Sequence, residues 1–194
     1  MHPVEMADRL VRQVDFLRTE GVAGPEVPNV LSVAVHPADL DPELDVGALA
    51  EELAHAVAET ARRRGWRTGG PVEVEIVPDP ETPRGFLEAR GERRPGRLPA
   101  WGQLVAHDGR LVLSLRDNRV VVGRALDADV VVPDPAVSRR HAVVARDAEG
   151  IHLVDLGSAN GTFLNGRRVE EATRVVPGDE IAFGRRRFVL RMAG

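Results

Sequence analysis

The sequence predicts two domains, a small N-terminal α/β (α+β) domain followed by an all-β antiparallel sandwich. The hydrophobic pattern changes between them, because residues before 90 follow a helical period with two strand-like runs and residues after 102 form short β runs between turns. The charge changes at the same place: residues 1–100 carry 12 arginines and 18 acids, and residues 101–194 carry 14 arginines and 12 acids. We therefore expect domains at 1–89 and 103–194, joined by a Gly/Pro/Arg-rich linker at 90–102.

The composition excludes several classes of protein. The net charge of −4 argues against general nucleic-acid binding, which requires a concentrated basic face. The chain has no cysteine, which excludes disulfides, thiolate metal sites and cysteine nucleophiles. No apolar run approaches the roughly 18 residues of a membrane span, and the first residues lack a signal-peptide pattern. We expect a soluble cytoplasmic protein without membrane insertion, cofactor or metal.

The first segment predicts a helix and then a strand. Its apolar positions share one helical stripe: Val4, Leu10, Val11, Val14 and Leu17. Leu31, Val33 and Val35 alternate with smaller residues, as in a strand with one buried face.

A second helix is expected from Val46 to Arg64. Asp45 is a suitable N-cap, and Gly65 follows the last turn. Residues 72–76 alternate apolar side chains with glutamates and predict a second strand. This strand–helix–strand order favours a right-handed crossover if the strands are parallel. Gly69-Gly70-Pro71 is interpreted as a turn, since no helix follows it to bind a phosphate.

The C-terminal half contains ten short β runs, which fit two packed antiparallel sheets. They are Gln103–Ala106, Leu111–Leu115, Val120–Gly123, Val130–Val132, His141–Arg146, Ile151–Asp155, Thr162–Leu164, Arg167–Val169, Glu180–Phe183 and Arg187–Met192. Asn165-Gly166 is the strongest hairpin dipeptide in the chain. In such a sandwich the loops at one end are free to carry a binding site.

Four short motifs fall in these loops or at strand ends. They are Gly123-Arg124, the Ser138-Arg139-Arg140-His141 tract, the segment from Ser158 to Thr162, and Asn165-Gly166. Each alone is a weak signal, because short motifs arise easily by chance. Together, in this order, they resemble the forkhead-associated (FHA) domain, a phosphothreonine-binding β-sandwich with Gly-Arg, Ser-x-x-His, Asn-Gly-Thr and Asn-Gly motifs.

The resemblance implies a phosphothreonine site in this chain. A phosphothreonine carries a charge of about −1.5 to −2 and three acceptor oxygens. Arg124 offers a planar fork of donors, Ser138 a short hydroxyl and Arg139 a second cation. By the family's motif, Asn160 holds the peptide backbone beside the phosphothreonine. The remaining motif residues shape the site, and they are Gly123, His141, Gly161, Thr162, Asn165 and Gly166.

One residue departs from the family's pattern. Ala159 stands where many FHA relatives have a hydroxyl or a longer polar residue, which puts a secondary contact in doubt. Short stretches of residues 3–90, including Val27-Pro28-Asn29-Val30 and Gly70-Pro71-Val72, also look like the N-terminal domain of actinobacterial FhaA-type proteins. The linker, however, has only about a dozen residues where those relatives have a long one. This second resemblance implies a role in Ser/Thr-kinase signalling.

The leading interpretation is a non-enzymatic adaptor. Its partners would be phosphothreonine-containing proteins such as a Ser/Thr kinase, a pseudokinase or a kinase substrate, and such a partner could recruit it to a membrane. The alternative is a phosphate-independent protein-interaction scaffold. Ser138, His141 and Asp155 suggest a catalytic triad, but no Gly-x-Ser-x-Gly elbow supports it. A further alternative is self-inhibition, in which the chain's own phosphothreonine binds in the site. Thr82, in Pro80-Glu81-Thr82-Pro83, is the most exposed-looking candidate for that phosphorylation.

Overall fold

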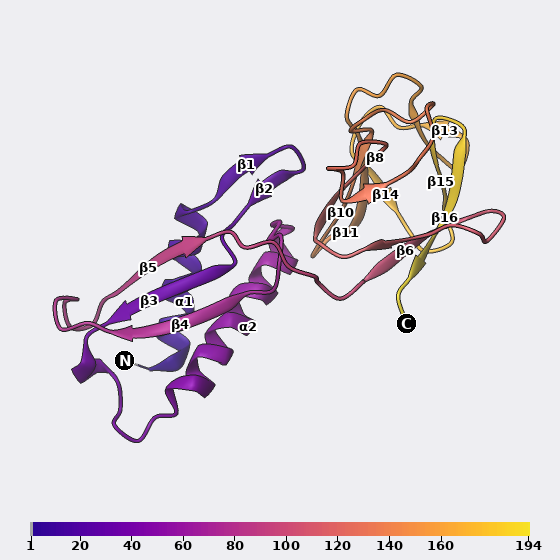
Figure 1. The fold of residues 1–194 in the computed structure, drawn as a ribbon. Helices are drawn as coiled ribbons and strands as arrows, with labels where there is room; N and C mark the ends of the chain where they lie inside the picture. The colour runs from indigo at the N-terminus through magenta and orange to yellow at the C-terminus, as the bar shows by residue number, and fades with distance from the viewer. Residues whose placement is uncertain (1) are drawn as a thin grey trace. The chain divides into compact units, whose positions relative to one another are not determined.

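The computed structural model describes residues 2–194, which divide into two compact units (Figure 1). The first unit extends to Arg97 but does not include Val22–Gly24. The second unit contains Leu98–Gly194 together with Val22–Gly24. Each unit has its own core and is described by itself.

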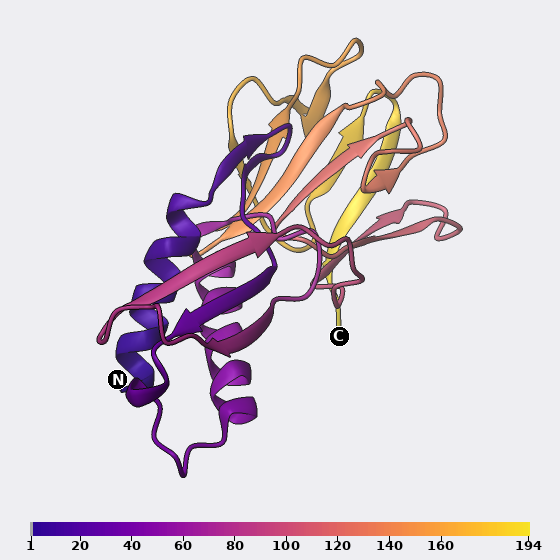
Figure 2. The same ribbon diagram turned by 60° about the vertical axis from the view of Figure 1, so that its left-hand side comes forward.

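The N-terminal unit is a three-stranded sheet covered on one face by two helices (Figures 1 and 2). Its elements are α1 (Pro3–Phe16), β1 (Thr19–Gly21), β2 (Gly24–Glu26), β3 (Val30–Val35), the 3₁₀ turn η1 (Pro37–Asp39), α2 (Val46–Arg64), β4 (Glu73–Pro78) and β5 (Leu87–Glu92). The strand order is β4-β3-β5, with β3 parallel to β4 and antiparallel to β5. The α/β prediction for this half is therefore confirmed.

Local sequence signals place the two long helices. The Asp45 carboxylate accepts a hydrogen bond from the Ala48 N–H at 3.0 Å, and Gly65 adopts φ 64° after the last turn of α2. In α1, Leu10 and Val14 are buried as expected, but Val4 is 60% exposed and Met6 takes the buried position in the first turns. The helical stripe is therefore narrower than the apolar pattern suggests.

Strand β5 is absent from the sequence-based prediction. Only Leu87 and Ala89 are apolar in it, and its second half is exposed and polar. The strand forms because it pairs with β3 along its whole length, and because the Gln13 side chain bonds its backbone at Leu87 and Ala89. These partners lie far away in the sequence, so a local pattern carries little signal for this strand.

The linker expected at 90–102 is shorter in the structure. Strand β5 continues to Glu92, and the buried Asn29 amide donates to the carbonyls of Pro71 and Arg94 and accepts the Arg94 N–H at 2.9 Å. Residues up to Arg94 therefore belong to the N-terminal unit. At the other end, Trp101 is 7% exposed within the second core.

The C-terminal unit is a β-sandwich of two sheets, as predicted. Its strands are β6 (Gly102–Ala106), β7 (Val112–Leu115), β8 (Arg119–Gly123), β9 (Val130–Val131), β10 (Ala142–Asp147), β11 (Gly150–Asp155), β12 (Thr162–Leu164), β13 (Arg167–Arg168), β14 (Thr173–Val175), β15 (Glu180–Phe183) and β16 (Arg186–Met192). The sheet orders are β14-β11-β10-β8-β9 and β13-β12-β15-β16-β6-β7. Strand β14 is missing from the prediction, and the short β8–β9 pair is parallel.

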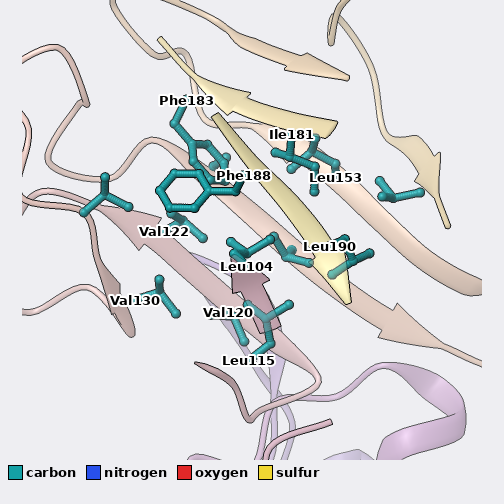
Figure 3. Close-up of a cluster of buried hydrophobic side chains, with 14 of the residues drawn as sticks. Leu104, Leu115, Val120, Val122, Val130, Leu153, Ile181, Phe183, Phe188 and Leu190 are labelled. Carbon is teal, nitrogen blue, oxygen red and sulfur yellow. The ribbon is translucent and has the colours of Figure 1, made fainter. Parts of the chain in front are cut away.

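The core of the sandwich contains apolar side chains from both sheets, which pack together in Figure 3. Val120 and Val122 come from one sheet, and Phe183, Phe188 and Leu190 come from the other. All five are at most 1% exposed. This packing fixes the strands whose connecting loops carry the motif residues.

Two further expectations can be compared with the fold. Thr82 is 3% exposed, and its hydroxyl is directed to the Asp79 carboxylate at 3.4 Å, so the expectation of an exposed phosphorylation site is wrong. The turn that contains Thr82 folds this side chain inward. Across residues 2–194, neither helix combines the length and hydrophobicity needed to span a bilayer.

Candidate phosphopeptide site

Three of the predicted phosphate-binding residues line one open cavity of about 660 Å³. Its lining consists of Arg124, Ala125, Asp127, Ser138, Arg139 and Arg140. Arg124 and Arg139 are exposed, and neither makes an ion pair with any residue in 2–194. The cavity therefore offers two positive charges that no carboxylate of the described chain neutralises. Two guanidinium groups of this kind suit an anion with several oxygens.

Backbone hydrogen bonds bring the two halves of this cavity together. The Arg124 N–H donates to the Ser138 carbonyl at 3.0 Å, and the Ala125 N–H donates to the Arg139 carbonyl at 3.2 Å. Gly123 permits this approach, because a Cβ at that position would lie 2.0 Å from the Arg139 carbonyl oxygen. A glycine is required here by space rather than by backbone angle.

Ser138 connects the cavity to a third loop. Its Oγ accepts the Ala159 N–H at 3.0 Å, which leaves the hydroxyl hydrogen available for a ligand. Asn160 follows directly and is exposed, with its Nδ2 donating to the Ala136 carbonyl at 2.7 Å. Its Oδ1 makes no hydrogen bond with the residues in 2–194. Asn160 thus lies beside the cavity but does not line it.

His141 joins two of these loops from beneath. It is fully buried, its Nδ1 accepts the Ser138 N–H at 2.9 Å, and its Nε2 lies 3.0 Å from the Gly161 carbonyl oxygen. Because Nδ1 accepts, Nε2 carries the proton and donates. Burial lowers the pKa of His141, although the hydrogen bond to Gly161 and the nearby Asp155 charge oppose that shift. The neutral ring therefore braces the site.

Asp155 holds the loop that carries Asn160. Its carboxylate accepts the Ser158 hydroxyl and the Thr162 hydroxyl, each at 2.6 Å, and the Ser158 N–H at 3.0 Å. Burial by itself would raise the pKa of Asp155, but the hydrogen bonds from Ser158 and Thr162 outweigh it and lower the pKa. Thr162 is thus an anchor of the loop rather than a ligand contact.

The possible triad does not have the geometry of a nucleophile and its base. The His141 ring contacts the Ser138 backbone N–H, not its hydroxyl, and the Asp155 carboxylate bonds two hydroxyl groups of its own loop. A serine nucleophile requires the base within hydrogen-bond reach of its Oγ. The hydrogen bonds of these three residues instead connect the loops around the cavity.

Asn165 and Gly166 form the hairpin turn that their dipeptide predicts. Both have positive φ, 49° and 80°, as a two-residue turn of this kind requires. The Asn165 amide donates to the Asp179 carboxylate and accepts the Glu180 N–H, each at 2.9 Å. They lie outside the cavity lining and hold the β12–β13 hairpin in place.

Sequence reasoning missed two charged residues of the cavity. Asp127 and Arg140 form an ion pair of 3.1 Å at its rim, and both side chains are more than half exposed. Arg140 is adjacent to the predicted Arg139, but no sequence pattern indicated that Asp127 would form an ion pair with Arg140. This ion pair depends on how the loop after β8 folds.

Residues 120–184 match the family described as FHA domain, and residues 1–90 match the family described as FhaA, N-terminal domain. FhaB of Mycobacterium tuberculosis is 34% identical over 109 residues, which cover 55% of this chain and 67% of FhaB. The chain belongs to the FHA-domain family. FhaA of the same organism is 38% identical over 78 residues, 40% of this chain.

The FHA-domain relatives are longer than the aligned region. This chain covers 15% of FhaA and 14% of a mycobacterial ABC transporter ATP-binding/permease protein to which it is 34% identical over 129 residues. Among solved structures, the FhaA FHA domain complexed with the intracellular domain of Rv3910 is 34% identical, with a TM-score of 0.43. It covers 46% of this chain, and 99% of that domain is matched.

Proposed function

We propose that this protein binds phosphothreonine peptides through the cavity between Arg124, Ser138 and Arg139. The supporting observation is that Arg124, Ser138 and Arg139 line one open cavity, and that neither arginine has a carboxylate partner in residues 2–194. A phosphate dianion satisfies both cations and accepts the hydroxyl hydrogen. The Asn160 side chain, next to the cavity, is suited to hold the peptide backbone.

The same site favours a role as an adaptor in Ser/Thr-kinase signalling. The partner would be a kinase, a pseudokinase or a kinase substrate that carries phosphothreonine. FHA-family membership and the FhaA-type N-terminal domain support this role. His141 and Asp155 make hydrogen bonds that organise loops, which fits recognition rather than turnover.

Calorimetry of the full 194-residue chain with a degenerate phosphothreonine peptide library tests the proposal. Arg124→Ala leaves a bound phosphate poorly paired, at a cost of about 2–5 kcal/mol, so we expect affinity to fall at least about 30-fold. The control is Arg110→Ala, an exposed arginine that is not part of the cavity lining. Equal binding by the Arg124 variant and the wild type would refute the site, and binding of the unphosphorylated library would favour the scaffold alternative.

A further inference from the structure

Strand β4 is an unpaired edge of the N-terminal sheet. It stands at the end of the order β4-β3-β5, and within residues 2–194 it pairs with β3 alone. The Glu73 N–H donates to the Asn29 carbonyl at 2.7 Å, which directs the backbone groups of Glu73 to the β3 side. Because alternate residues of a strand direct these groups to opposite sides, the N–H and C=O of Val74 and Ile76 point away from the sheet. No hydrogen bond from the described residues engages them.

Two prolines limit the length of this open edge. Pro78 is the last residue of β4 and has no N–H, and Pro71 lies just before the strand. Proline within a sheet is confined to edges, so its place in β4 fits a strand with a single neighbour. The open donors and acceptors between the two prolines suit one short extended segment, which could join the sheet as an added strand.

The side chains of β4 beside this edge are acidic. On the sheet face that the helices leave uncovered (Figure 2), β4 presents Glu73 and Glu75, and both are exposed. The chain already places one guanidinium on this face, because Arg94 donates to the Glu73 carboxylate at 3.1 Å and to the Glu92 carboxylate at 2.7 Å. Glu75 makes no ion pair with any residue in 2–194. The carboxylate available to a partner is therefore that of Glu75.

A groove of about 540 Å³ lies over the same face, with Ser32, Glu75 and Arg90 in its lining. Ser32 of β3 stands between the two charged residues, since it pairs with Glu75 of β4 and with Arg90 of β5. Neighbouring strands lie about 4.8 Å apart, so a strand added to β4 would lie about 14 Å from β5. Charges are largely screened beyond about 8–10 Å. Glu75 rather than Arg90 therefore decides which charge an added strand should carry.

We propose that β4 binds a short extended segment of a partner protein, in which lysine or arginine occupies alternate positions. The backbone of the segment pairs with Val74 and Ile76, and one of its basic side chains lies opposite Glu75. A second copy of this chain fits less well, because pairing β4 with itself sets glutamates opposite glutamates, and like charges directly opposite are destabilising. This binding does not use the phosphothreonine cavity and goes beyond the proposed function.

The test is calorimetry of the full chain with short peptides that carry arginine at alternate positions, each paired with a version in which glutamate replaces arginine. We expect the arginine peptide to bind more tightly than the glutamate version. A series of arginine peptides methylated at one backbone nitrogen at a time should lose and keep affinity alternately, because every second N–H of an added strand faces β4. Binding should also slow hydrogen exchange of the Val74 and Ile76 amides, which NMR measures.

Glu75→Arg tests the charge without altering the backbone of β4. It should weaken binding of the arginine peptide about 2- to 30-fold, because a favourable cross-strand pair becomes a repulsive one, and it should strengthen binding of the glutamate version. Glu88→Arg is the matched control, because Glu88 is exposed on the same face without an ion pair in residues 2–194 but lies on β5. This variant should keep the wild-type affinity.

The inference is wrong if no arginine peptide binds, if Glu75→Arg binds it as tightly as the wild type, or if the methylated series shows no alternation. Slow exchange of the Val74 amide in the protein without peptide, together with a dimer in sedimentation, would assign the edge to a second copy and would also overturn it. None of these results depends on Arg124, so the proposed function is tested separately.

Discussion

Replacing Ser138 with alanine separates what this residue does for the fold from what it does for the ligand. In the free protein, the Ser138 Oγ accepts the Ala159 N–H at 3.0 Å, and its hydrogen is left for a phosphate oxygen. The substitution removes both bonds and only one oxygen atom. It therefore tests the hydroxyl without changing the charge of the cavity.

The two losses have different expected sizes. The bond to Ala159 joins neutral groups at a partly exposed position, so its loss should lower the free energy of unfolding by about 0.5–1.5 kcal/mol. A hydrogen bond to a charged phosphate contributes about 1.5–3 kcal/mol, and its loss should weaken peptide binding about 10- to 150-fold.

Calorimetry with phosphothreonine peptides measures the loss of affinity, and urea unfolding measures the loss of stability. Ser114→Ala is the control, since Ser114 lies on β7 and outside the cavity lining. A Ser138→Ala protein that is less stable yet binds phosphopeptide as well as wild type would refute the reasoning, because the hydroxyl would then serve the fold alone.

Three further predictions concern the same loops. Gly123→Ala places a Cβ 2.0 Å from the Arg139 carbonyl oxygen, so it should lower the thermal midpoint and abolish phosphopeptide binding. A Gly123→Ala variant with wild-type affinity would contradict the close approach of the Gly123 and Arg139 backbones. Burial lowers the pKa of His141, so the unfolded chain takes up a proton first as the pH falls below about 6.5. The free energy of unfolding should therefore keep its full value above that pH and decline below it, which urea unfolding at several pH values would measure. An NMR titration in which the His141 ring titrates at its ordinary pH would contradict this reasoning. Asp127→Asn frees Arg140 from its ion pair and should tighten phosphopeptide binding about two- to fivefold, but not in an Arg140→Ala background, which a double-mutant cycle measures.

Several parts of the fold could be predicted because their signals are local. Asp45 and Gly65 mark the ends of α2 through hydrogen bonding and backbone conformation that depend on a few residues. The alternation of Leu31, Val33 and Val35 predicts a half-buried strand for the same reason. Strand β5 could not be found in this way, because its partners lie on β3 and α1 and its own sequence is largely polar.

The two-domain order, the sandwich and the order of the motifs could be predicted from the residues alone, since periodicity and turn residues act over a few positions. The common cavity of Arg124, Ser138 and Arg139 could not be predicted in this way, because backbone contacts between separate loops bring these residues together. The burial of Thr82 likewise depends on the tertiary fold. Contacts of this kind join residues distant in sequence, and no local pattern encodes their distances.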